Sequence, residues 1–213
     1  VVPVPSVGAQ VLAQVQAGRA QLDVLDIGEV ATLQLDKHGA IEPIPYDRFK
    51  LTNPDDIDAA MRRPRMVGNV YAATVLVYNT QVFKPGAHPR SWAEFWNTER
   101  FPGPRTLADA KTGSAAELEF ALLADGVPLT RLYPIDVDRA FASLTRIKPA
   151  VVKWWETGPM SSELLERKEV VAGGLWNGRA QDLIDKGAPL AIEWNQAKRL
   201  RQFYSIVKGA PNR

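Results

Sequence analysis

The stretch VVAGGLWNGRAQDL, residues 170–183, places a strand pattern directly before a helix pattern. An apolar run that contains two glycines ends at Trp176, and a helix-like pattern follows from Ala180. Between them lie Asn177, Gly178 and Arg179, and a core strand has no need of an amide and a cation there. Because a strand that leads into a helix is typical of α/β proteins, this stretch predicts that class and a binding edge.

The same alternation of strands and helices extends along the chain. The longest predicted strand is VYAATVLVY, residues 70–78, which has no breaker inside. Capping boxes at 91–94 and 114–117 predict two helix starts, and residues 198–201 are expected to form a surface connection. Further strands are expected at three places, residues 22–27, 190–194 and 203–207. This order predicts an α/β fold with largely parallel sheets.

The composition is that of a folded globular protein. Of the 213 residues, 46% are hydrophobic and 23% are charged, and no run approaches the roughly 18 apolar residues of a membrane span. The net charge of +2 argues against a nucleic-acid surface, and the basic clusters 62–65 and 198–201 are expected to form a solvated loop or a sheet edge. The absence of cysteine excludes disulfides, thiolate metal sites and cysteine nucleophiles.

The sequence contains no recognisable catalytic motif. His38 and His88 have no companion at metal-ligand spacing, and His88 is expected to be a solvated loop residue. Nucleophile-elbow, phosphate-loop and dinucleotide-binding patterns are absent. The sequence therefore predicts a protein that is not an enzyme and uses no cofactor.

Several segments, taken in order, resemble one family of transport proteins. They are VYAATVLVYNTQVF (70–83), PRSWAEFWNTERFPGPRTL (89–107), LYPIDVDRAFASLTRIKPAV (132–151), VVAGGLWNGRA (170–180) and GAPLAIEWN (187–195). The series resembles the periplasmic solute-binding proteins of ABC importers, most nearly the spermidine/putrescine-binding branch. The resemblance implies the type 2 periplasmic-binding-protein fold, in which two lobes close over a solute and deliver it to a membrane permease.

The resemblance also implies a division of the chain. Residues 1–74 and 203–213 would form part of the first lobe, and residues 75–202 a second lobe inserted through two hinge crossings. Members of the family have further elements before Val1 and after VKGAPN (207–212), so the first lobe is expected to be incomplete. A removed export signal and a periplasmic location follow from the same resemblance.

Candidate solute contacts in the first lobe lie at helix starts and at the crossings. They are Ser6, Asp26, Thr74 and Tyr204. Structural explanations stay open beside the binding ones: Ser6 and Asp26 are also suitable N-caps, and Thr74 is also a suitable inward-facing strand residue.

Candidate contacts in the second lobe are Glu117, Trp155, Trp176, Asn177 and Arg179. Glu117 matches the region where the polyamine binders place a carboxylate, although it also completes a capping box. One of the adjacent indoles of Trp154 and Trp155 is expected to face the cleft. Trp176 is the strongest candidate, because the family's WNG motif places this indole against the solute.

Two departures from the polyamine-binding branch leave the solute class open. That branch has a small residue where Arg179 stands and an acid where residues 202–205 have none. A guanidinium repels a dication, which favours an amino-acid-like solute or an organic anion. If Arg179 instead points away, capping the sheet or pairing with Asp182, a polyamine-like amine stays open as the solute. The alternatives are a hydrolytic enzyme and a protein-interaction module without solute binding, which burial of Trp155 and Trp176 would favour.

Overall fold

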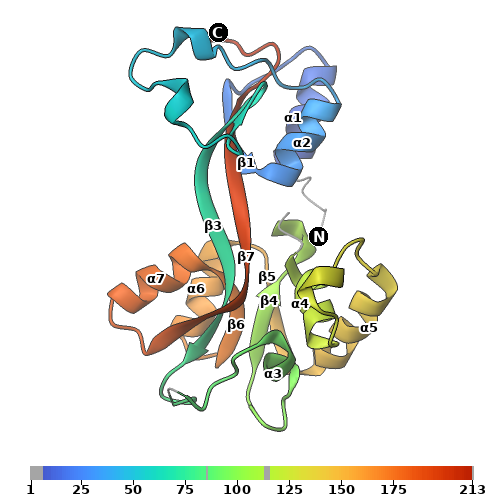
Figure 1. Cartoon of the computed structure of the whole chain (residues 1–213), viewed down its shortest axis with the longest axis vertical. Coiled ribbons are helices and arrows are strands. Elements are labelled where there is room, and N and C mark those ends of the chain that lie inside the picture. Colours follow the sequence, from blue (N-terminus) through green and yellow to red (C-terminus); the bar gives the residue numbers. More distant parts are fainter. Residues whose placement is uncertain (1–6, 85, 113–115, 213) are drawn as a thin grey trace. The chain divides into compact units, whose positions relative to one another are not determined.

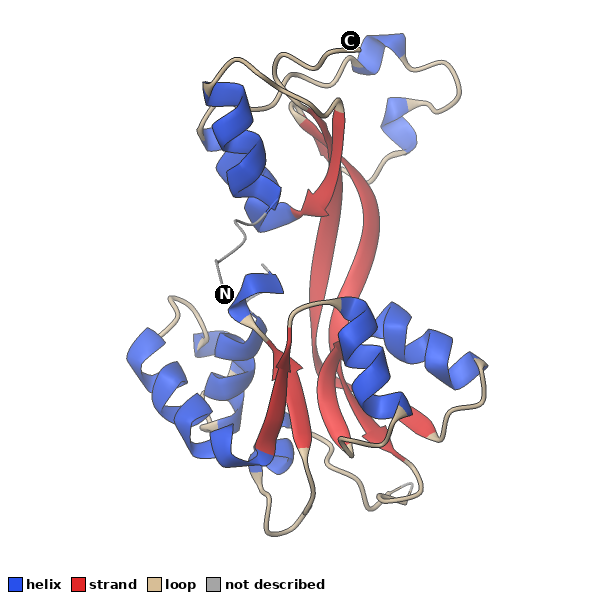
Figure 2. Cartoon of the chain, turned by 180° about the vertical axis from the view of Figure 1, so that it is seen from behind, coloured by secondary structure: helices blue, strands red, loops and turns tan. Residues whose placement is uncertain are grey.

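The computed structural model describes residues 7–84, 86–112 and 116–212 (Figure 1). The chain divides into two compact units, one of residues Val1–Ala72 with Leu200–Arg213 and one of residues Ala73–Arg199. Helices and strands alternate in both units (Figure 2), which confirms the α/β class. No helix in the described ranges is long and apolar enough to cross a membrane. That the two units act as hinged lobes stays a prediction.

The first unit packs two helices against a small antiparallel sheet. Its elements are α1 (Val7–Gln16), β1 (Val24–Gly28), α2 (Glu29–Lys37), β2 (Arg62–Arg63), the start of β3 (Met66–Asn79) and the end of β7 (Leu190–Ile206). Gly18 and Gly39 follow the two helices with positive φ, as expected of helix-ending glycines. In the sequence, a proline and two acids at residues 54–56 predict a helix that extends to residue 61, but the structure has only a 3₁₀ turn, Pro54–Asp56.

The second unit carries three short parallel strands with helices on both faces. Its strands are β4 (Arg105–Ala108), β5 (Val151–Trp155), β6 (Ala172–Trp176) and the remainder of β3 and β7. Its helices are α3 (Trp92–Trp96), α4 (Ala116–Ala124), α5 (Val137–Ile147), α6 (Gly158–Glu166) and α7 (Asn177–Asp185). The strand order is β1-β7-β3-β6-β4-β5, with β2 on β3.

The sheet is mixed rather than largely parallel. Strand β4 pairs in parallel with β5 and with β6, as expected of strands joined by helices. The pairs β1–β7, β2–β3 and β3–β6 are antiparallel. The prediction therefore holds for the three short strands of the second unit and fails for the pairs that include the two long strands.

Alternate side chains of the strands build two separate cores in the second unit. Leu76 of β3 packs with Trp92 and Phe120, whereas its neighbour Val75 packs with Trp155 and Leu164. Helices α3, α4 and α5 contribute to the first core, and α6 and α7 to the second, on the other side of the strands (Figure 1). Strands β4 to β6 are therefore covered on both faces.

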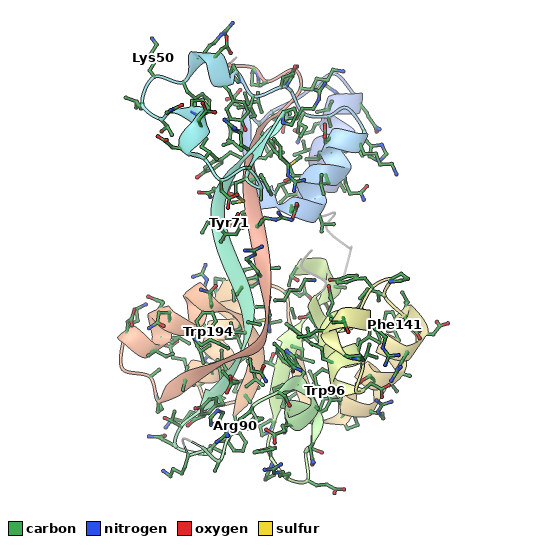
Figure 3. The ribbon with its side chains drawn as sticks, viewed as in Figure 1. Lys50, Tyr71, Arg90, Trp96, Phe141 and Trp194 are labelled. Atoms are coloured by element: carbon green, nitrogen blue, oxygen red, sulfur yellow. The ribbon has the colours of Figure 1, made fainter. Side chains whose placement is uncertain are left out.

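Two elements differ from the sequence-based expectation. Residues 198–201 are not a surface connection, because β7 is a single strand of 17 residues, Leu190–Ile206. In α5 the helical spacing of Val137, Phe141, Leu144 and Ile147 predicts a shared apolar face, but Phe141 lies on the outer side of the helix and is 57% exposed (Figure 3), whereas Ile147 is buried.

Candidate functional site

The carboxyl ends of three parallel strands meet at one edge of the second unit. Strand β4 ends at Ala108, β5 at Trp155 and β6 at Trp176, and β4 lies between the other two. Helices α6 and α7 begin within three residues of β5 and β6, and α4 follows β4 after a short connection. Helix N-termini carry free N–H groups and a positive dipole end, so this edge suits a polar or anionic ligand.

The indole of Trp176 is half-buried at this edge. Its ring packs edge-on against Trp155, with centroids 5.1 Å apart and planes at 82°. The Nε1 atom of Trp176 is buried and has no hydrogen-bond partner in the described part of the chain. Thr74, directly opposite Trp176 in the β3–β6 pair, is 1% exposed, and its Oγ1 also has no partner there. Two unused donors are thus present in one pair of neighbouring residues.

Arg179 is exposed in the first turn of α7. It makes no ion pair with any described residue, and the expected alternative partner, Asp182, is bound instead by Lys186 at 2.8 Å. A cation near a helix N-terminus is opposed by the helix dipole, so helix stability does not explain this residue. The arginine is available to a ligand.

Asn177 serves the fold as well as the site. Its Oδ1 accepts a hydrogen bond of 2.9 Å from the backbone N–H of Ala73 and so ties the start of α7 to β3. Because the carbonyl oxygen is used in this way, the solute contact expected of Asn177 stays a prediction, and the group predicted to make it is the amide nitrogen.

Trp155 is a core residue, which corrects the expectation that it contacts a solute. It is fully buried, and its Nε1 donates to the carbonyl oxygen of Gly174 at 2.9 Å. Trp154 packs on the opposite face, against the other core. Both adjacent indoles can be accommodated because helices cover both faces of β5.

Glu117 lies in the first turn of α4 with its carboxyl group turned inward. The side chain is 6% exposed, and Oε1 accepts from the backbone N–H of Ala108 at 3.2 Å. Burial raises the pKa of Glu117 to about 7. Ser114, the other half of the predicted capping box, lies outside the described residues.

The first unit holds two of the remaining candidates as neighbours. Asp26 of β1 lies directly opposite Tyr204 of β7, and both side chains are exposed. Asn69 donates from Nδ2 to Asp26 Oδ2 at 2.9 Å, a contact that no sequence signal indicated. Asp26 does not cap α2, whose N-cap is Gly28. Ser6 lies outside the described residues.

Two further expectations about charged residues are corrected. The basic clusters are not merely solvated, because Arg63 and Arg201 both bind Glu29, at 2.7 and 2.9 Å. His88 is not a solvated loop residue: it stacks on Tyr78 with centroids 4.2 Å apart, and its Nε2 lies 3.1 Å from Glu193. Within the described ranges no group of three or more His, Cys, Asp or Glu residues could hold a metal ion.

Residues 1–212 match the family model described as bacterial extracellular solute-binding protein. The chain belongs to this family. The predicted resemblance to solute-binding proteins is thereby confirmed, whereas its spermidine/putrescine branch is not.

Three relatives show which solute-binding proteins this chain is similar to. The gamma-aminobutyric acid-binding protein of Pseudomonas aeruginosa is 34% identical over 96% of this chain and 57% of its own length. An ABC transporter structure from Rhodopseudomonas palustris CGA009 is 34% identical, with a TM-score of 0.90 over 99% of this chain and 63% of its own. The PBP MotA from A. tumefaciens B6, in complex with glucopine, is 31% identical, with a TM-score of 0.85 over 96% and 63%. The chain thus spans less than two thirds of each relative.

A cavity of about 690 Å³ in the second unit lies apart from all these candidates. Its lining includes Val152 and Lys153 from the start of β5, Leu164 of α6 and Arg167 just after α6. None of the lining residues is a candidate solute contact. The cavity therefore does not change the assignment of the site to the carboxyl ends of the strands.

Proposed function

We propose that this solute-binding protein captures a small amino acid through its carboxylate and delivers it to the membrane permease of an ABC importer. The observation that carries the proposal is Arg179, an exposed guanidinium without an ion pair among the described residues, in the first turn of α7. It lies beside Trp176, whose Nε1 is also unused. The extracytoplasmic location is part of the same proposal.

The chemistry of this edge favours an anion. A guanidinium binds a carboxylate through two parallel hydrogen bonds, which a helix N-terminus reinforces. The indole of Trp176 supplies an apolar face for a methylene chain. A relative that is 34% identical is named for gamma-aminobutyric acid, which has a carboxylate, three methylenes and an ammonium. This solute matches the groups present at the edge.

The ammonium group of such a solute needs a carboxylate or an aromatic face. In the first unit, exposed Asp26 beside the ring of Tyr204 has the right chemistry, and both remain predicted contacts. In the second unit, Glu117 is less suitable because its burial favours the neutral carboxylic acid.

A polyamine is the second candidate solute. The exposed carboxylate of Asp26 favours it, but a dication needs more than one acid and Glu117 is buried. The unpaired Arg179 opposes it. Full burial of both Trp155 and Trp176 would favour the interaction-module alternative, and only Trp155 is fully buried.

A thermal-shift panel on the full-length protein tests the solute class. We expect 4-aminobutyrate to raise the melting temperature and putrescine, spermidine and succinate to leave it unchanged. At about 100 times the dissociation constant, a bound solute adds roughly 2.7 kcal/mol to the free energy of unfolding. Stabilisation by putrescine or spermidine alone would overturn the proposal in favour of the polyamine alternative.

A further inference from the structure

Gly158 occupies a crowded position at the start of α6. It is the first residue of the helix and is buried, directly after the N-cap Thr157. Its carbonyl oxygen accepts hydrogen bonds from Ser161 Oγ at 2.7 Å and from Ser162 Oγ at 3.3 Å. These bonds fix the Gly158 peptide from within its own helix, so the residue cannot easily retreat from its neighbours.

The space where a side chain of residue 158 would lie is filled by the two central residues of the candidate site. A Cβ atom there would lie 2.8 Å from Nε of Arg179 and 3.2 Å from both Cε3 and Cζ3 of Trp176. The first distance is shorter than any ordinary contact of a Cβ atom, and the others are tight. Gly158 is not among the glycines with positive φ, so the need for glycine here is steric.

A second glycine at the same edge, in contrast, has room for a side chain. Gly178 lies in the first turn of α7, one residue before Arg179, and a Cβ there would have no heavy atom within 4 Å. An alanine at this position tests the general effect of adding a methyl group near a helix N-terminus. It leaves the contacts between α6 and α7 unchanged.

We propose that Gly158 is a positioning residue that sets where the Arg179 guanidinium lies. The expected effect on solute preference rests on the function proposed above. Of the two neighbours, Arg179 must yield to an added Cβ, because it is exposed and flexible whereas the Trp176 ring is held against Trp155. Gly158→Ala therefore displaces the guanidinium and spares the indole. The site loses its preference for a carboxylate and keeps its apolar contact.

The position of the guanidinium is measured first, without any solute. The Nε–H resonance of Arg179 in a ¹⁵N spectrum of the full-length protein is assigned by its disappearance in Arg179→Ala. We expect Gly158→Ala to shift this resonance and Gly178→Ala to leave it in place. An unshifted resonance in Gly158→Ala would overturn the proposal, whatever the solute proves to be.

Solute preference is measured next with two probes of equal shape, 4-aminobutyrate and 4-aminobutanamide. We expect Gly158→Ala to reduce the preference for the acid about tenfold, as lost contact with a guanidinium should, and Gly178→Ala to keep it. In an Arg179→Ala background the same change should alter neither affinity. Equal losses for both probes in both backgrounds would identify Gly158 as merely structural.

The two failures are distinguishable. If the wild-type protein shows no preference for the acid, the proposed solute class is wrong, and the resonance of Arg179 still decides the role of Gly158. If Gly158→Ala does not fold, the double variant Gly158→Ala with Arg179→Ala tests the role of Gly158 instead. That variant should fold, because the clash at Nε is removed, and its failure to fold would contradict the proposal.

Discussion

At the scale of single residues, Glu117 gives the sharpest expectation of pH dependence. Its pKa is raised from the usual value of 4.5 to about 7, because burial disfavours the charged carboxylate. Between these values the folded state holds the proton more tightly than the unfolded chain. The stabilising contribution is therefore complete below about pH 4.5 and is lost as the pH rises through about 7, a loss on the order of 3 kcal/mol.

Glu117→Gln should remove this part of the pH dependence. We expect the wild-type free energy of unfolding to fall between pH 5 and pH 8 relative to the variant, as measured by urea unfolding at both pH values. Glu163→Gln is the control, since Glu163 is exposed on α6. Parallel pH profiles for wild type and Glu117→Gln would show that the carboxyl group is not buried as described.

The sequence identified the candidate residues better than their roles. Trp176 and Arg179 were found because an indole and a cation at the end of a strand have no use in a core. Trp155 was misassigned, because nothing in WWETG, residues 154–158, shows that helices cover both faces of β5. Asn69 was missed, since its contact with Asp26 joins residues 43 positions apart.

At the scale of elements, helices were easier to predict than strands. Residues that end helices, Gly18, Gly39 and Pro149, together with the N-cap Asp136, predict α1, α2 and α5 within a few residues, because these signals are local. Strands β4 and β5 were missed, since four or five residues give too short a pattern. The charged run 198–201 looked like a loop, but Lys198 and Arg201 find partners in Glu119 and Glu29 across the fold.

The carboxylate of Glu29 joins three elements of the first unit. It holds Arg63 of β2 and Arg201 of β7 to the start of α2, and all three side chains are less than a third exposed. Glu29→Gln leaves two partly buried guanidinium groups without their anion. We expect the melting temperature to fall, with a loss of about 1–2 kcal/mol in the free energy of unfolding.

The matched control for this variant is Glu166→Gln, an exposed carboxylate of α6. Differential scanning calorimetry of both variants measures the change in melting temperature. Equal stability of Glu29→Gln and Glu166→Gln would mean that the two arginines do not depend on Glu29.

At the scale of the whole molecule, the chain matches the solute-binding protein family over residues 1–212. The ordered series of motifs was enough to predict a solute-binding protein, because family resemblance accumulates along the entire chain. The polyamine branch was not confirmed, and a relative that is 34% identical is named for gamma-aminobutyric acid. Strands β3 and β7 each have residues in both units, and their role as hinge crossings stays a prediction.

The most direct test of the central claim is a calorimetric titration of the full-length protein with 4-aminobutyrate, for wild type, Arg179→Gln and the control Arg167→Gln. Arg167 lies just after α6 and pairs with Glu163. We predict one-to-one binding that weakens about 10- to 100-fold in Arg179→Gln alone, as loss of a charge-assisted hydrogen-bond pair should. Equal affinities in all three proteins, or no binding to wild type, would contradict recognition of a carboxylate by Arg179.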